Sequence, residues 1–124
     1  MPVSTWFIGP HLIGFLFIVL GVIQKRFPPK KINNYYGYRM PSAMKNQQTW
    51  DEANRYAGVI MIKTGMVIFI AGLIITILMH EINISARTMF LCNYLVILVS
   101  TMGSVLTLIV ATENHLDKTF KDRQ

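Results

Sequence analysis

Three long stretches of apolar residues alternate with polar segments along the chain, at residues 6–24, 59–79 and 89–111. At 1.5 Å of rise per residue, each would form a helix of roughly 28–35 Å, which matches a hydrocarbon core about 30 Å thick. No polar stripe at helical spacing runs through them, although the helices of a soluble bundle would need one. Because backbone amides inside lipid need internal partners, the pattern predicts an all-α membrane protein with three transmembrane helices in a single domain, residues 1–124.

The composition agrees with a membrane protein. Charged residues make up 15% of the chain, against about 25% in soluble domains. Of these charges, Lys63 alone lies inside an apolar stretch. This segregation excludes an ordinary soluble globule, a disordered chain and a disulfide-rich secreted domain. The net charge of +6 does not indicate a nucleic-acid partner, because a soluble nucleic-acid binder spreads its basic residues over a polar surface.

The basic residues fall almost entirely on one side of the predicted helices. The loop 25–57 and the tail 112–124 carry most of them, whereas the other side has Arg87. Cytoplasmic segments collect Lys and Arg, so we expect the loop and the C-terminus in the cytosol and the N-terminus outside. Residues 1–5 carry no Lys or Arg and no A-x-A-type site follows the first stretch, which favours an uncleaved helix over a signal peptide. The basic residues of the predicted cytosolic side outside the apolar stretches are Lys25, Arg26, Lys30, Lys31, Arg39, Lys45, Arg55, Lys118, Lys121 and Arg123.

Small residues recur at helical spacing in each apolar stretch, and they allow helices to approach closely inside lipid. Such stripes serve packing within the chain or contact with a second copy in a homo-oligomer, and the sequence leaves both open. The stripes are Gly14 and Gly21 in the first stretch, Gly58, Gly65 and Gly72 in the second, and Ser100, Ser104, Thr107 and Ala111 in the third.

The loop between the first two stretches has local signals of structure. Ser42 after Pro41 is placed to cap a short helix. Thr49 and Glu52 match a capping box, which predicts a helix that begins at Trp50 and continues into the second apolar stretch. We therefore expect a structured cytosolic loop rather than a plain linker.

Several residues of this loop together resemble a known family. The candidate motif and binding residues are Asn34, Gly37, Tyr38, Arg39, Ser42, Lys45, Asn46, Trp50 and Asn54. The run Gly37-Tyr38-Arg39, followed by Ser42 and Lys45 and then by Trp50, Ala53-Asn54 and Gly58 before a membrane helix, is similar to the SdpI family. The resemblance implies a multi-pass protein of the bacterial cytoplasmic membrane, similar to immunity proteins that protect a cell from a secreted, membrane-active peptide toxin. It also implies a cytosolic surface that captures a regulator.

Arg39 is the candidate for direct contact with a ligand, because a guanidinium pairs bidentately with a carboxylate or phosphate. Asn34, Asn46 and Asn54 would complete a polar cluster beneath the helices. Alternatively, the same network only folds the loop back on the helix ends, with Arg39 bound to carbonyl groups or to Glu52. The sequence leaves both interpretations open.

A second candidate site is the basic cluster that follows the first apolar stretch, formed by Lys25, Arg26, Lys30 and Lys31. Cations at this level attract anionic lipid headgroups. The same four residues also serve as the signal that sets orientation, so membrane lipids are expected partners and a defined headgroup site is a weaker expectation.

The sequence offers no sign of catalysis. It has no glycine-rich phosphate loop, no nucleophile motif and no metal-ligand spacing. Asp51 and Glu52 are adjacent and would diverge on a helix. We therefore expect a protein that binds rather than an enzyme, with no cofactor and no metal. The alternatives are an accessory subunit of a larger membrane protein complex and a lipid-handling or transport component.

Overall fold

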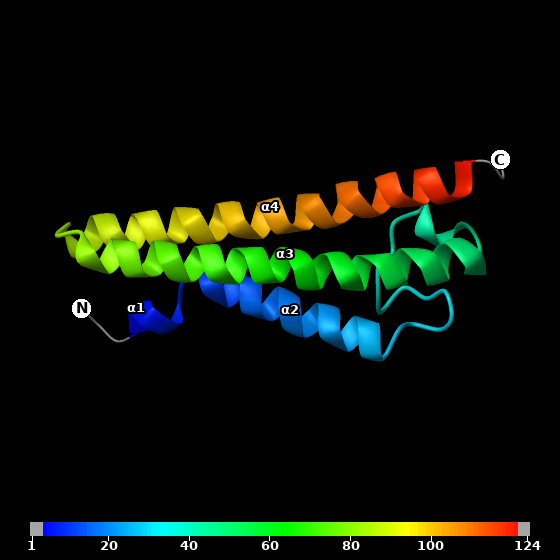
Figure 1. Ribbon diagram of the computed structural model, residues 1–124, viewed down its shortest axis with the longest axis horizontal. Coiled ribbons are helices and arrows are strands. Elements are labelled where there is room, and N and C mark those ends of the chain that lie inside the picture. The colour runs from blue at the N-terminus through cyan, green and yellow to red at the C-terminus, as the bar shows by residue number, and fades with distance from the viewer. Residues whose placement is uncertain (1–3, 122–124) are drawn as a thin grey trace.

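The computed structural model describes residues 4–121, and within this range the chain is all-helical, as the sequence predicts. Its elements are α1 (Ser4–Phe7), α2 (Pro10–Arg26), the 3-10 helix η1 (Ala43–Lys45), α3 (Gln47–Glu81) and α4 (Ala86–Phe120). The helix α3 packs against both α2 and α4, whereas α2 and α4 share few contacts. The long loop between α2 and α3 therefore lies beside the C-terminal end of α4, at the opposite end from the α3–α4 turn (Figure 1).

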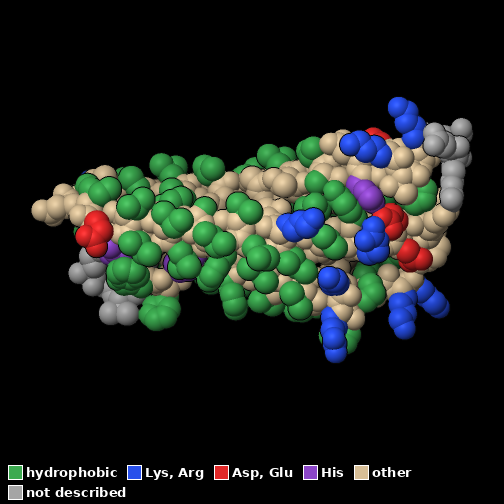
Figure 2. Space-filling view, viewed as in Figure 1, with side chains coloured by type: hydrophobic (Ala, Val, Ile, Leu, Met, Phe, Trp, Pro, Cys, Tyr) green, Lys and Arg blue, Asp and Glu red, His purple; other side chains and the backbone are tan. Residues whose placement is uncertain are grey.

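Two helices, α3 and α4, are each long and apolar enough to cross a membrane. The shorter α2, with 17 residues, extends about 26 Å. Large apolar side chains on these helices are exposed, among them Val67 at 68%, Phe90 at 70% and Val99 at 69%. Figure 2 shows apolar side chains over much of this face and the Lys and Arg side chains gathered toward the loop end. Soluble monomers rarely expose large contiguous apolar patches, so these helix faces are suited to contact with lipid.

The first apolar stretch is not one continuous helix, contrary to the expectation for residues 6–24. The short α1 ends at Phe7 and α2 begins at Pro10. Proline has no N–H to donate and disfavours a helical residue before it, and Gly9 is extended, with φ −151° and ψ −179°. The carbonyl oxygen of Ile8 accepts a hydrogen bond of 2.8 Å from Asn93 Nδ2 of α4. This bond ties the break to the third long helix.

The start of α3 differs from the prediction in its cap. The helix begins at Gln47 rather than at Trp50. Asn46 is the N-cap: its side chain accepts from the Thr49 N–H at 2.9 Å, and Thr49 Oγ1 accepts from the Asn46 N–H at 3.3 Å. The capping box predicted at Thr49 and Glu52 is therefore wrong. Asn is as strong an N-cap as Ser or Thr, and here it precedes a third-position Thr that returns the bond.

The C-terminal segment also differs from the expected tail. The helix α4 continues beyond the third apolar stretch to Phe120. No Gly or Pro follows Gly103 in the sequence, so nothing in the chain breaks the helix there. Residues 1–3 and Arg123, which entered the predicted charge distribution, lie outside the described residues.

Glycines allow α2 and α3 to meet at backbone distance. A Cβ added at Gly14 would meet the backbone nitrogen of Phe69, and one added at Gly65 would lie 2.8 Å from the carbonyl oxygen of Gly14. A Cβ at Gly21 would lie 2.9 Å from the Gly58 carbonyl oxygen. The small-residue stripes of the first two apolar stretches therefore pack against each other within the chain.

Candidate functional site

The side chain of Asn54 lies at the centre of the loop's hydrogen bonds and is 1% exposed. Its Oδ1 accepts from the Tyr38 N–H at 2.6 Å and from Gln24 Nε2 at 3.2 Å. Its Nδ2 donates to the carbonyl oxygens of Trp50 at 3.0 Å and Tyr38 at 3.4 Å. One buried amide, with its donors and acceptors paired as burial requires, thus joins α2, α3 and the loop.

The backbone conformation of Gly37 allows the loop to reach Asn54. Gly37 has φ +102°, a conformation that side-chain-bearing residues rarely adopt. A Cβ at this position would also collide with Asn54 Oδ1. Glycine is therefore needed twice here, for the turn and for the close approach that lets the next residue, Tyr38, bond to Asn54.

Trp50 and Tyr38 hold the loop by burial. Trp50 is fully buried, and its Nε1 donates to the carbonyl oxygen of Pro29 at 2.8 Å, which fixes the chain where it leaves α2. The ring of Tyr38 belongs to a buried cluster in which alanines of α3 leave room for it. The other buried members of this cluster are Ala43, Ala53, Ala57 and Leu116.

Glu113 of α4 joins the third long helix to the same loop. Its Oε1 accepts from Tyr38 Oη and from Ser42 Oγ, both at 2.6 Å. Burial of the phenol, supported by the hydrogen bond and the charge of Glu113, raises the pKa of Tyr38 well above 10.0, so the hydroxyl remains a donor. Ser42 precedes the short helix η1 but makes no side-chain cap bond, so its predicted capping role is wrong. Its hydroxyl is committed to Glu113 instead.

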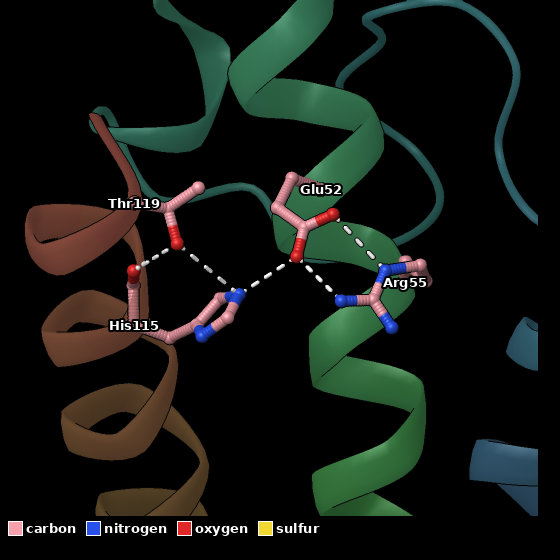
Figure 3. A network of polar contacts seen from close by, with 4 residues as sticks. All are labelled: Glu52, Arg55, His115 and Thr119. Carbon is pink, nitrogen blue, oxygen red and sulfur yellow. Dashed lines mark hydrogen bonds and ion pairs between the residues drawn. The ribbon is translucent and has the colours of Figure 1, made fainter.

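A second network of polar contacts joins α3 to α4 (Figure 3). Glu52 accepts from Arg55 Nε at 3.0 Å, and its Oε1 lies 2.7 Å from His115 Nε2. The hydrogen bond from Arg55, opposed by partial burial and supported by His115, lowers the pKa of Glu52 to about 2. Thr119 Oγ1 donates to the His115 carbonyl oxygen at 2.7 Å. The His115 ring also stacks on Tyr56, with 3.8 Å between ring centroids.

Arg39 lies on the exposed side of the loop. Its Nη1 donates to the carbonyl oxygen of Asn34, and it makes no ion pair within residues 4–121. The alternative pairing with Glu52 is wrong, because Glu52 binds Arg55 and His115. The guanidinium therefore keeps donors free for another molecule.

The three asparagines that were predicted to form one polar cluster have different roles in the structure. Asn54 is the buried centre described above, and Asn46 caps α3. Asn34 is exposed and contributes its backbone carbonyl to Arg39. Within the described part of the chain, no hydrogen bond joins the three amides to one another.

A crevice of about 570 Å³ lies between α2, α3 and α4 beside the loop. Asn34, Gly37, Tyr38 and Arg39 line its loop side, so the structure brings these predicted residues together. Apart from Gln24 of α2, the helix wall is apolar. It includes Met61 of α3 and Val105 and Leu108 of α4.

The remaining predicted residues lie elsewhere. Ser42, Lys45 and Asn46 line a separate hollow beside the C-terminal end of α4. Lys25 and Lys30 line a cavity of about 560 Å³ between the end of α2 and α3. Arg26 and Lys31 are exposed and do not line that cavity.

Sequence reasoning missed Gln24, Glu113 and His115. Gln24 is the polar end of an otherwise apolar stretch, and this is the one local signal that could have marked it. Glu113 and His115 follow the third apolar stretch and read as ordinary tail residues. Their importance depends on partners far away in the chain.

The described residues offer binding contacts of two kinds. The crevice combines free guanidinium donors with apolar surface, and the second cavity combines cations with the end of a membrane helix. Among residues 4–121, no group of three or more His, Cys, Asp or Glu is arranged to hold a metal ion.

Comparison with known proteins agrees with the resemblance of the loop. The chain matches the model of the SdpI/YfhL protein family over residues 30–112, which include the loop, α3 and most of α4. It is 48% identical over 62 residues to "Uncharacterized protein YfhL" of Bacillus subtilis (strain 168); the match covers 50% of this chain and 56% of that protein. No solved structure matches the chain. With its Gly-Tyr-Arg turn and its Ala-Asn pair folded together at the end of long apolar helices, the chain belongs to the SdpI/YfhL family and is a membrane protein of that family.

Proposed function

We propose that this protein gives a bacterial cell tolerance to a membrane-active peptide, and that it acts by binding the peptide rather than by catalysis. The chain belongs to the SdpI/YfhL family, and the resemblance of its loop to that family implies an immunity-type role. The observation that carries the proposal is the crevice beside the loop, where the exposed guanidinium of Arg39 adjoins an apolar helix wall. Asn54 and Trp50 hold the loop in place, so the site exists before a ligand arrives.

The chemistry of the crevice suits a peptide that partitions into membranes. Arg39 has free donors for a carboxylate, either an acidic side chain or a chain terminus. Met61, Val105 and Leu108 provide apolar surface, and methionine adapts to ligands of different shape. The volume of about 570 Å³ lies within the usual range for binding pockets, about 300–1,000 Å³.

The proposal includes an orientation in the bacterial cytoplasmic membrane. The N-terminus lies outside, α2 and the stretches 59–79 and 89–111 cross the membrane, and the loop and C-terminus face the cytosol. The excess of basic residues on the loop side supports this orientation. Met61 lies near the start of the second crossing and Leu108 near the end of the third, so the crevice sits at the inner boundary of the hydrocarbon. A peptide that has already entered the bilayer would reach it sideways from the lipid, which explains how a cytosolic motif meets a toxin that arrives from outside.

The test is survival of a sensitive bacterium that expresses the full chain and is exposed to a membrane-active peptide. Loss of a charged hydrogen bond removes about 1.5–3 kcal/mol, or roughly 10- to 150-fold in affinity. We therefore expect Arg39→Ala to lose most of the protection. Arg26→Ala removes the same charge from an exposed position away from the crevice and should retain it.

Both variants must reach the membrane in equal amounts, which immunoblots of membrane fractions would verify. Equal killing with and without the wild-type chain would refute the proposal for that peptide, and an equal loss in both variants would refute the role of Arg39. Co-purification of a stoichiometric membrane complex, without any protection, would favour the accessory-subunit alternative instead.

A further inference from the structure

Cationic side chains from three parts of the fold line the cavity between the end of α2 and α3. Lys25 comes from the last turn of α2, Lys30 from the loop and Arg55 from α3. Asp51 and Val59 complete this part of the lining of a cavity of about 560 Å³. The positive charges outnumber the negative one, so the cavity favours an anion.

The two lysines are available for a ligand. Neither Lys25 nor Lys30 makes an ion pair within the described range 4–121, whereas Arg55 shares its charge with Glu52. Asp51 is engaged by Gln47, whose Nε2 donates to Asp51 Oδ1 at 2.7 Å. The two lysine ammonium groups are therefore the main free charges of the cavity.

The backbone that carries Lys30 is held at two adjacent carbonyl groups. Gln47 Nε2 donates to the Lys30 carbonyl oxygen at 2.6 Å, and Trp50 Nε1 donates to that of Pro29 at 2.8 Å. The position of Lys30 relative to α3 is thus fixed by side chains of α3 itself. This anchoring makes the cavity a formed site rather than a chance meeting of flexible residues.

The position of the cavity along the helices indicates which kind of anion it would bind. Lys25 follows the first apolar stretch directly and Val59 begins the second, so the cavity lies where apolar helix gives way to polar chain. Exposed apolar side chains continue from this level toward the centre of the apolar region, among them Val22, three residues before Lys25 on α2, and Met66, seven residues after Val59 on α3. A phospholipid has its phosphate and its acyl chains in this same order.

We propose that this cavity is a specific site for an anionic phospholipid, whose phosphate is bound by Lys25 and Lys30 with support from Arg55. Its acyl chains lie along the exposed apolar side chains of α2 and α3. The site uses only two of the four residues in the basic cluster, since Arg26 and Lys31 do not line the cavity. The inference does not depend on peptide binding, because Arg39 and the crevice take no part in it.

The experiment compares two double variants that remove equal charge from the same segment. The full chain in mild detergent is mixed with equal amounts of phosphatidylglycerol and phosphatidylcholine that have identical acyl chains, and native mass spectrometry measures the ratio of the two bound lipids. We expect the wild type to favour phosphatidylglycerol. Lys25→Gln with Lys30→Gln should reduce this preference by about fivefold per lysine, whereas Arg26→Gln with Lys31→Gln should keep it.

All four side chains are exposed, so we expect the double variants to fold. Lys25→Arg with Lys30→Arg should preserve the preference. An equal loss in both Gln double variants would overturn the proposal, because it would reveal general attraction to the basic segment. Absence of any preference in the wild type would overturn it as well. Displacement of phosphatidylglycerol by millimolar inorganic phosphate would assign the cavity to free phosphate and overturn the lipid assignment.

Discussion

At the scale of single residues, the loop depends on contacts between one glycine, one asparagine and one glutamate. Gly37 places the backbone of the turn against Asn54, which in turn holds Gln24 and Tyr38. Glu113 of α4 accepts a hydrogen bond from the hydroxyl group of Tyr38. The family motif therefore supports the loop, and Arg39 is one of the motif residues that remain exposed, together with Asn34, Lys45 and Asn46.

We expect Gly37→Ala to destabilise the loop by about 1–3 kcal/mol, because alanine rarely adopts a positive φ and its Cβ would displace Asn54 Oδ1. The measurement is the thermal unfolding midpoint of the purified protein in detergent, together with the fluorescence of Trp50 in a Trp6→Phe background, where Trp50 should become more solvent-exposed. Gly103→Ala is the control, because no atom lies within 4 Å of a Cβ there. An unchanged midpoint for Gly37→Ala would contradict the role assigned to this turn.

At the scale of elements, the three long helices are packed unequally. The helices α2 and α3 meet through glycines at backbone distance, whereas α4 contacts α3 less extensively and has Gly103 facing open space within the described residues. Toward the loop end, α4 is joined to its neighbours by polar bonds at Glu113 and His115. The pair α2–α3 is therefore the most closely packed part of the bundle.

Gly14→Leu should separate α2 from α3, because the new side chain would have to occupy the space of the Phe69 and Gly65 backbone. We expect a loss of about 3 kcal/mol, at the upper end of the usual range for overpacking. Thermal unfolding in detergent measures the effect, and Gly103→Leu introduces the same side chain where nothing opposes it. If both leucine variants unfolded at the same temperature, close glycine packing would not be what holds α2 to α3.

At the scale of the whole molecule, the buried cluster and most of the charges lie at one end, and exposed apolar side chains cover the long helices beyond it (Figure 2). A soluble protein has the reverse arrangement, with its core in the middle of its helices. In a membrane protein the lipid covers the helix faces, so a buried core is needed mainly where the chain emerges into water. The loop end is that place in the proposed orientation.

Labelling of single cysteines in the full chain tests this orientation. With Cys92→Ser as background, a membrane-impermeant maleimide applied to intact spheroplasts should label Asn83→Cys in the α3–α4 turn. It should label Lys45→Cys in the loop only after lysis. Both positions are exposed, so access depends on the side of the membrane. The opposite labelling pattern would show that the protein has the inverse orientation, and it would refute the proposed cytosolic position of the motif.

The helical class, the separation of apolar from charged segments and the family motif can all be predicted from the order of residues alone. These features are local: they depend on residue type and on spacing within one turn or one stretch. The break at Gly9 and the N-cap at Asn46 also depend on local features, namely Pro10 and the bonds between Asn46 and Thr49. Both could therefore have been predicted from the sequence, although they were not.

Which residues act together depends instead on how the helices and the loop fold against one another. Gln24 lies 30 positions from Asn54 and Glu113 lies 75 positions from Tyr38, and no periodicity encodes such pairs. The same holds for the basic cluster, where folding brings Lys25 and Lys30 to Arg55 and leaves Arg26 and Lys31 outside. Hydrogen bonds and ion pairs form over a few ångströms of space, so their partners are fixed by how the helices pack and not by order along the chain.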